Sequence, residues 1–587
     1  MNARTSFEPL ERRQLLSAGA FDPTFGQGGK AATPFGFFPT DLALQADGKV
    51  VVVGDPTGIG TGDFKVGRLN ADGSVDKTFG GGTGLVTTDL AAKFGEVSEQ
   101  VAIEPDGKIV VGGTKYNADG GQWTLVRYNG DGTLDTTFGE QGVTTVLRGV
   151  ATFGMEDMAI QPDGKIVFTS EYGDTSGFID YDFITVRLNY NGAYDSTFGD
   201  ARKNGRAGYV KTGMGSQDFP TALLIQPDGK IIVGGHQNGG DFGDSTFAVM
   251  ARYTFDGRLD KTFDKDGKLT VELGIDARVK AMSLAADGKI VLAGDSEDAL
   301  VLMRLNPDGH IDHTMGGIDG AVYTKLSRHP EIDGVNAVFA RGDKIIMVGD
   351  QYSGKPTGLE LNIVRFNSDG TRDRTFGIDG IFRPGVGFVF HRSVAMTQDG
   401  RLVAATTTSG IAKPSVSRFT GIADPPTLRL ANADATAFES KTFVNGGTML
   451  LASDTISDFP IHVTLDVGGS AKFNTDYTSN LTLNGSVVAR AFGGDGISAS
   501  SQAYIDIPAG QSSVVLRINP IDDPIVEGTE DASFTLLANP AYRLGKNRTA
   551  GVSIGDDDLL IFRPFNVTLT RRHILDSIFS DREMKSA

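Results

Sequence analysis

The chain has 587 residues, more than one ordinary hydrophobic core accommodates, so we expect at least two domains. Its formal net charge of −18 argues against nucleic acid as a partner, because phosphate binding needs a basic face. The absence of cysteine excludes disulfides, thiolate metal sites and cysteine nucleophiles, and no apolar run of membrane-spanning length is present. The 78 glycines indicate many tight turns, as in sandwiches, barrels and propellers.

Residues 1–19 are interpreted as an export-type or disordered segment. They contain arginines and end in small residues, but they lack the hydrophobic stretch of a secretory signal. The string from Phe7 to Arg13, followed by Leu15-Leu16-Ser17-Ala18, resembles the short segment at the start of some large bacterial envelope and secreted proteins. This resemblance implies export, so we expect a secreted or cell-surface location. A disordered tail is the alternative.

A repeated turn dominates residues 20–421. Copies of Asp-Gly-Lys or a close variant recur every 56 to 65 residues, with their aspartates at Asp47, Asp106, Asp163, Asp228, Asp287, Asp343 and Asp399. Each turn lies between alternating apolar runs, which is typical of a β-hairpin whose glycine supplies the positive φ. Seven repeats long enough for four strands each predict a seven-bladed β-propeller.

A second string in each repeat predicts how the ring closes. An arginine is followed eight residues later by Asp-x-Thr-Phe or Asp-x-Thr-Met, and the arginines are Arg68, Arg127, Arg187, Arg252, Arg304, Arg365 and Arg418. Arg418 has no such ending after it, whereas Asp22-Pro23-Thr24-Phe25 stands unmatched before the first repeat. We therefore predict that residues 21–35 form the outer strand of the last blade, which removes the exposed sheet edges. These strings resemble the delta-60 repeat, a bacterial propeller-type family, and that resemblance implies no particular chemistry.

The repeated residues are predicted to be structural. An arginine and an aspartate at fixed spacing in every blade most simply form the same ion pair seven times, within or between blades, and the phenylalanines pack between blades. Ligand contacts are expected in the variable connections on the face opposite the Asp-Gly turns. Aromatic side chains there can stack on sugars or grip a peptide, and the candidates are Tyr116, Tyr172, Tyr181, His236, Phe242 and Tyr352.

Residues 422–558 are predicted to form a β-sandwich after the linker Ala423-Asp424-Pro425-Pro426. Carboxylates cluster at its expected strand ends, where their hard oxygens suit Ca²⁺ and would repel one another without a cation. The candidate ligands are Glu439, Asp476, Asp522, Asp523, Glu527, Glu530, Asp556, Asp557 and Asp558. A merely solvated set of acidic loops is the alternative. Residues 559–587 are an uninformative tail.

This region also resembles the Calx-beta domain. The resemblance rests on Asp476-Tyr477, Pro508-Ala509-Gly510, Ile521-Asp522-Asp523 with Glu527 and Glu530, and the closing Ile554 to Asp558. It implies an immunoglobulin-like sandwich whose acidic positions coordinate Ca²⁺. Two departures are Ser440, where the family usually has glycine after the glutamate, and the apparent insertion at residues 484–502.

These features favour an exported, non-catalytic binding or adhesion protein with a glycan or protein ligand. We expect a monomer with no membrane span. No metalloprotease, nucleophile-elbow or phosphate-loop motif is present. An extracellular propeller enzyme, a polysaccharide lyase or hydrolase, is the first alternative, and a purely structural envelope protein is the second. Two convergent carboxylates, or a histidine beside a carboxylate, on the variable face would favour the enzyme.

Overall fold

The structure is a computed structural model. It describes residues 19–55, 62–90, 94–117, 120–146, 151–152, 154–173, 181–199, 208–215, 217–239, 245–271, 277–296, 299–317, 320–326, 334–352, 359–387, 389–407, 414–438, 446–454, 461–471, 477–483, 486–487, 489–491, 501–508, 511–521, 528–539 and 542–555. These are the described residues. Within them no helix is long and apolar enough to cross a membrane.

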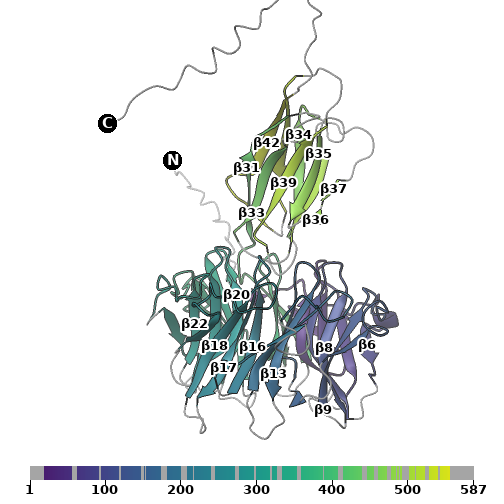
Figure 1. Ribbon diagram of the computed structural model, residues 1–587, viewed down its shortest axis with the longest axis vertical. Helices are drawn as coiled ribbons and strands as arrows, with labels where there is room; N and C mark the ends of the chain where they lie inside the picture. The colour runs from purple at the N-terminus through teal and green to yellow at the C-terminus, as the bar shows by residue number, and fades with distance from the viewer. Residues whose placement is uncertain are drawn as a thin grey trace, which may run out of the picture.

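Seven antiparallel blades form a propeller (Figure 1), and blades 3 and 4 are joined into one nine-stranded sheet by the parallel pair of Tyr181 and Gln217. Blade 1 contains β3 (Phe38–Leu44), β4 (Val50–Asp55), β5 (Phe64–Leu69) and β6 (Leu85–Thr88). Blade 2 contains β7 (Glu96–Ile103), β8 (Ile109–Asn117), β9 (Gly120–Tyr128) and β10 (Val143–Val146). Blade 3 contains β11 (Ala151–Thr152), β12 (Asp157–Ile160), β13 (Ile166–Gly173), β14 (Tyr181–Leu188) and β15 (Tyr209–Thr212). Blades 4 and 5 contain β16 (Gln217–Ile225), β17 (Ile231–Gly239), β18 (Ser245–Tyr253) and β19 (Lys268–Val271); and β20 (Arg278–Leu284), β21 (Ile290–Ser296), β22 (Ala299–Leu305) and β23 (Ala321–Thr324). Blades 6 and 7 contain β24 (Gly334–Arg341), β25 (Lys344–Tyr352), β26 (Leu359–Asn367) and β27 (Ile381–Phe382); and β28 (Val389–Met396), β29 (Leu402–Thr407) and β30 (Pro414–Thr420).

The first strand of each blade lies nearest the ring axis. These strands contact one another in order around the ring, from β3 through β7, β12, β16, β20, β24 and β28 back to β3. The second strands contain an apolar run directly after the Asp-Gly turn because both faces of a blade pack against neighbouring blades, and Val50 to Val53 in β4 are fully buried. The prediction of an all-β, seven-bladed propeller is confirmed.

The N-terminal strands close the ring in blade 7. Both β1 (Ala20–Phe21) and β2 (Lys30–Ala32) pair antiparallel with β30, and Phe21 lies opposite Phe419. Asp22 Oδ2 accepts a hydrogen bond from Arg418 Nε at 2.8 Å, although 396 residues separate the two in the chain. The seventh arginine therefore receives its aspartate from the other end of the propeller, as the sequence predicted.

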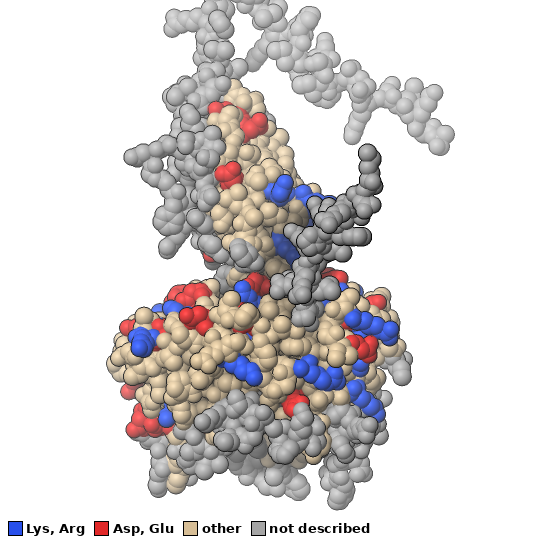
Figure 2. All heavy atoms as spheres, turned by 180° about the vertical axis from the view of Figure 1, so that it is seen from behind, with Lys and Arg blue, Asp and Glu red and all other residues tan. Residues whose placement is uncertain are grey.

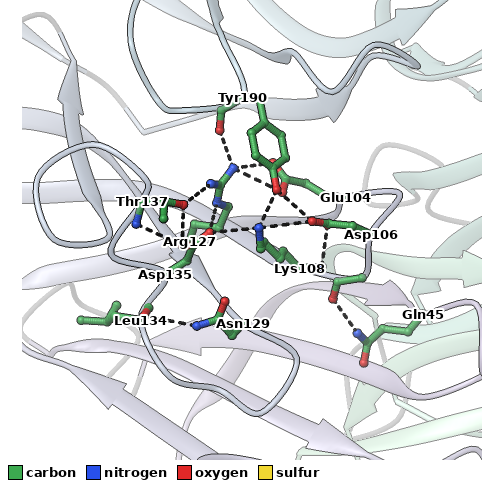
Figure 3. Close-up of polar contacts among 11 residues, drawn as sticks. Gln45, Glu104, Asp106, Lys108, Arg127, Asn129, Leu134, Asp135, Thr137 and Tyr190 are labelled. Atoms are coloured by element: carbon green, nitrogen blue, oxygen red, sulfur yellow. Dashed lines mark hydrogen bonds and ion pairs between the residues drawn. The ribbon is translucent and has the colours of Figure 1, made fainter. Parts of the chain in front are cut away.

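The repeated arginine joins strands within a blade and also joins neighbouring blades (Figure 3). Arg127 Nε donates to Asp135 Oδ2 at 2.9 Å within blade 2, and its Nη1 donates to the backbone oxygen of Tyr190 in blade 3. Its guanidinium lies over the rings of Phe138 and Tyr190. Lys108 of the Asp-Gly-Lys turn also reaches Asp135, at 3.3 Å. The same aspartate contact recurs at Arg68, Arg187, Arg252, Arg304, Arg365 and Arg418.

Residues 427–555 form a two-sheet sandwich. Its strands are β31 (Thr427–Asp434), β32 (Thr436–Phe438), β33 (Gly447–Ser453), β34 (Ile461–Gly469), β35 (Tyr477–Leu483), β36 (Ser486–Val487), β37 (Ala489–Ala491), β38 (Ser501–Ile507), β39 (Ser513–Pro520), β40 (Glu530–Leu536), β41 (Arg543–Leu544) and β42 (Thr549–Gly555). One sheet has the order β36-β35-β39-β33-β31-β41 and the other β32-β42-β40-β34-β38-β37. The short strands β36 and β37 lie inside the stretch that the sequence marked as an insertion.

The sandwich stands on the propeller face that carries the Asp-Gly turns (Figure 1). Gln511 Nε2 donates to the backbone oxygen of Pro227 in the first turn of blade 4, at 3.1 Å. The linker residue Ala423 is buried and bonds through its N–H to Gly400, the corresponding turn of blade 7. The variable connections lie on the opposite face of the propeller, which we call the loop face.

Candidate functional site

One position in the first strand of each blade, which we call the axial strand, does not keep the same residue from repeat to repeat. The residue seven places before the aspartate of each Asp-Gly turn differs between blades, and in blades 1 to 6 it is Thr40, Glu99, Glu156, Thr221, Lys280 and Asn336. In blades 1, 2, 4, 5 and 6 this residue falls where the register between the first and second strands shifts by one. Such β-bulges redirect a side chain and occur often beside functional sites.

Glu99 joins blades 2 and 3 near the axis. Its Oε2 accepts a hydrogen bond from the backbone N–H of Met155 at 2.5 Å and another from Thr114 Oγ1 at 3.2 Å. Thr40 and Thr221 occupy the same position in blades 1 and 4, and each donates its hydroxyl to a backbone oxygen of the next blade. A neutral threonine therefore suffices for the bond between blades, and the carboxyl group of Glu99 requires another explanation.

Glu171 lies close to this seam from the second strand of blade 3. Both β11 and β12 pair with β13, and residues 154–156 lie in a bulge between them opposite Ser170 and Glu171. Ser170 Oγ donates to the backbone oxygen of Gly154 at 2.7 Å, and Glu156 N–H donates to Thr169. Glu171 is 7% exposed, and its Oε2 has no hydrogen-bond partner in the structure. Glu99, Glu156 and Glu171 thus gather where blades 2 and 3 meet, and we call them the glutamate cluster.

Two members of the cluster, Glu99 and Glu171, have raised pKa values. Burial is the main cause that raises the pKa of Glu99 to about 8, and the charges of Glu156 and Glu171 raise it further. Burial and the charge of Glu156 likewise raise the pKa of Glu171 to about 8. Glu99 and Glu156 are nevertheless partly exposed, so solvent reaches the cluster. Buried ionisable groups lower the stability of a fold, and they cluster at functional sites.

The opposite side of the axis is cationic. Arg278 and Lys280 of β20 both lower the pKa of His236, which burial brings to about 3, so the imidazole is neutral. They also act on the partly buried carboxyl group of Asp295, whose pKa burial raises. The charged groups that act on His236 are thus the cations Arg278 and Lys280. A carboxylate beside the histidine, which would favour an enzyme, is not among them. The loop-face end of the axis is polarised, with acids at blades 2 and 3 and bases at blade 5.

The aromatic side chains that were predicted to contact a ligand lie at different places in the structure. Phe219 and His236 are stacked in blade 4 with ring centroids 5.0 Å apart, and Tyr181 of blade 3 lies tilted against Phe219 at 5.6 Å. We call these three rings the stack. Lys211 Nζ lies 3.4 Å from the centroid of the Tyr172 ring.

Tyr116 lies near Glu99, since the charges of Glu99 and Asp55 add to burial in raising its pKa. Tyr352 ends β25 in blade 6, away from these groups. Phe242 lies outside the described residues.

Sequence reasoning missed both the glutamate cluster and a second acidic group. Asp63, Asp89 and Glu96 offer oxygens within 4.8 Å of one another at the loop-face edge of blades 1 and 2. Both oxygens of Glu96 already accept the N–H of Leu90. The sequence signal for the glutamate cluster is that Glu99 and Glu156 stand at a repeat position where blades 1 and 4 have threonine.

The described strand ends that adjoin the predicted calcium ligands lie at one end of the sandwich. Phe438 pairs with Gly555, Tyr477 with Pro520, and Glu530 with Ile554. The residues that continue from these strand ends are the acidic candidates Glu439, Asp476, Asp522, Asp523, Glu527 and Asp556 to Asp558, which all lie outside the described residues. Glu530 is described and partly buried. This acidic end is opposite the end that carries Gln511, and so it points away from the propeller.

The propeller surface carries side chains of both charges. Figure 2 shows acidic and basic side chains interspersed over the visible side of the propeller. Many of the lysines belong to Asp-Gly-Lys turns, where they pair with aspartates, as Lys230 does with Asp228 at 3.2 Å.

Comparison with known proteins identifies the propeller repeats. Six segments match the family model described as "Domain of unknown function (DUF5122) beta-propeller", at residues 45–79, 104–138, 161–198, 226–263, 285–314 and 343–376. The N-terminal part of the chain, to about residue 375, thus consists of DUF5122 beta-propeller repeats. No curated protein matches the chain.

Solved structures are similar to each part at low identity. The apo-form Calx CBD1 domain is 19% identical with a TM-score of 0.16, and the match covers 22% of this chain and 98% of that chain. CBD12 from CALX1.2 is 17% identical with a TM-score of 0.15, covering 22% and 44%. The beta-propeller domain of the Trilobed protease from Pyrococcus furiosus is 10% identical with a TM-score of 0.37, covering 66% and 95%.

Proposed function

We propose that this is an exported, cell-surface binding protein whose propeller recognises a glycan or protein ligand through its loop face. The observation that carries the proposal is the contrast between two kinds of repeat position. The arginine and aspartate positions are the same in every blade and hold the blades together. The axial positions near the loop face differ from blade to blade and carry partly exposed or buried polar groups. Variation on a rigid scaffold is the usual basis of recognition.

The stack of Tyr181, Phe219 and His236 supports a ligand with flat apolar faces, as a sugar ring has. The imidazole is neutral, so it acts in this stack as an apolar ring and not as a cation. Because the sandwich stands on the turn face, the loop face is the side on which a large ligand can approach the axis.

Binding is tested on a glycan array with the full chain and the variant Phe219→Ala. We expect the wild type to bind a restricted set of glycans and Phe219→Ala to lose at least tenfold in affinity, because the middle ring of the stack is removed. Phe255→Ala is the control, since Phe255 is an exposed ring in a turn of blade 4. Equal losses in both variants, or no bound glycan, would count against sugar recognition at this face.

A carbohydrate-cleaving enzyme is the second candidate, and the glutamate cluster is what favours it. Neighbouring carboxyl groups with raised pKa values are the usual source of a general acid in glycoside cleavage. The same array experiment, followed by analysis of the released products, separates the candidates. Release of shortened glycans by the wild type and its loss in Glu171→Gln would establish the enzyme.

We further propose that the sandwich binds Ca²⁺ at its acidic end, away from the propeller. The support is the strand register, which gathers the starts or ends of β32, β35, β39, β40 and β42, each flanked by an acidic candidate. Oxygen ligands supplied by adjacent loops suit the six to eight coordination positions of Ca²⁺ better than the stricter octahedron of Mg²⁺.

Calorimetry of the full chain tests the calcium site. One unfolding transition should shift to higher temperature in millimolar Ca²⁺, because a ligand at a hundredfold excess over Kd stabilises the folded state by about 2.7 kcal/mol. Asp523→Asn combined with Glu530→Gln should abolish the shift, whereas Asp466→Asn, in the middle of β34, should retain it. Absence of both a binding heat and a shift would show that the acidic end does not bind calcium.

A further inference from the structure

We propose that the glutamate cluster binds an alkylammonium group of the ligand at the loop-face end of the ring axis. This inference rests on the proposed binding function and names the chemistry of one contact. It concerns Glu99, Glu156 and Glu171, which the exchange of repeat residues and the bulge at residues 154–156 bring to the seam of blades 2 and 3.

The first argument is an unsatisfied acceptor. Glu171 is more than nine-tenths buried, and its Oε2 has no hydrogen-bond partner in the structure. It stands opposite the bulge that carries Glu156, next to the seam that Glu99 crosses. A buried carboxyl oxygen without a partner is costly, and a donor supplied by a ligand would satisfy it.

The second argument is the comparison between blades. Threonine makes the bond between blades at the position of Glu99 in blades 1 and 4, so the carboxyl group of Glu99 replaces a neutral residue that the fold accepts at the same place. The position of Glu171 is acidic in blades 1, 5 and 6 as well, but Thr114 occupies it in blade 2, so a neutral residue is accepted there too. When they are ionised, the glutamates place negative charge at blades 2 and 3, whereas the cations Arg278 and Lys280 lie in blade 5, and so the glutamates favour a cationic ligand.

The third argument concerns the kind of cation. Among the described residues, only Asp63, Asp89 and Glu96 form a carboxylate group with all ligand atoms within 4.8 Å. The glutamate cluster is thus more open than a preformed metal site, whose Ca²⁺–oxygen distances are about 2.3–2.6 Å. An ammonium group donates three hydrogen bonds at about 2.7–3.2 Å in divergent directions, which suits three separated acceptors. Tyr116, close to Glu99, adds an aromatic ring beside the site.

The experiment measures binding of cadaverine (pentane-1,5-diamine) to the full chain by titration calorimetry at pH 8.5. At this pH the carboxyl groups with pKa values of about 8 are largely ionised and the amines, near 10.4, remain charged. Pentane-1,5-diol is the neutral probe of the same shape. We expect saturable binding of the diamine and at least a tenfold weaker interaction of the diol.

The variants replace two of the glutamates by the residue that stands at the same repeat position in another blade, which we call the sister position. Glu99→Thr combined with Glu171→Thr should bind cadaverine at least tenfold more weakly while melting at the same or a higher temperature. Glu104→Gln is the control, because Glu104 is a buried carboxyl beside Arg127 and its sister positions carry Gln45 and Gln161. Unchanged cadaverine affinity in the double variant, equal binding of the diol, or no binding by the wild type would overturn the inference.

Two further measurements identify the source of the ammonium group and separate this inference from the proposed function. Competition by Nα-acetyl-lysine methylamide would indicate a lysine side chain as the source of the ammonium group, and its failure beside bound cadaverine would indicate a free amine. The glycan array reports on the stack of Tyr181, Phe219 and His236, which these variants leave intact. Glycan binding without cadaverine binding would therefore refute the ammonium contact and leave the proposed function standing.

Discussion

Deletion of residues 20–35 should open the propeller ring and lower the melting temperature of the propeller by a large margin. The deletion removes β1 and β2, both of which pair with β30. It also removes Phe25 and Phe35 from the core between blades 7 and 1. Arg418, 6% exposed, would keep its charge and lose Asp22, and breaking one side of a buried ion pair costs about 3–5 kcal/mol.

The exposed edge of β30 should also make the truncated protein associate, since an unpaired edge strand is a template for another chain. Differential scanning calorimetry and light scattering measure the two effects. Deletion of residues 2–18 is the matched control, and it should leave both quantities unchanged. A synthetic peptide of residues 19–36 added in excess should restore part of the lost stability. A monomeric truncated protein with the wild-type melting temperature would contradict closure by the N-terminal strands.

Much of the propeller could be predicted because its signals are repeated. The Asp-Gly turns fix the phase of the hairpins, and the spacing from Arg68 to Asp76 recurs in every blade, so an unmatched Asp22 and an unmatched Arg418 could be joined without knowing the fold in detail. The sequence could not decide whether the arginine acts within or between blades. It does both, because its Nε faces its own aspartate and its Nη1 reaches the next blade.

The glutamate cluster could not be predicted because nothing repeats there. Glu99 and Glu156 occupy a position whose other occupants are threonine, lysine and asparagine, and no shared letter marks it in the sequence. Their proximity to Glu171 depends on the bulge at residues 154–156, and bulges leave no reliable pattern in apolar alternation. The aromatic candidates were easier to find, because aromatic side chains stand out in the variable connections, and Phe219 joins two of them, Tyr181 and His236.

Arg187→Ala should destabilise the propeller by about 3–5 kcal/mol without changing ligand recognition. Arg187 is fully buried, and its Nε and Nη2 both bond to Asp195 Oδ2 at 2.8 Å. Its Nη1 donates to the backbone oxygen of Phe255 in blade 4, and its guanidinium lies 4.5 Å from the ring centroids of both Phe198 and Phe255. The substitution therefore leaves a buried carboxylate uncompensated and removes a bond between blades.

Arg258→Ala is the control for this prediction, because Arg258 pairs with Asp256 at 3.1 Å on the surface, where an ion pair contributes about 0–1 kcal/mol. Both variants are compared with the wild type by chemical denaturation of the full chain and by the glycan array. Arg187→Met combined with Asp195→Asn should recover part of the loss, since neither replacement leaves a buried charge. An Arg187→Ala protein with wild-type stability and no ligand binding would reverse the assignment and place the repeated arginine in the binding site. Arg187 lies in the turn-face half of β14, where the adjoining turns of blades 3 and 4 enclose it, so we expect the loss to appear in stability alone.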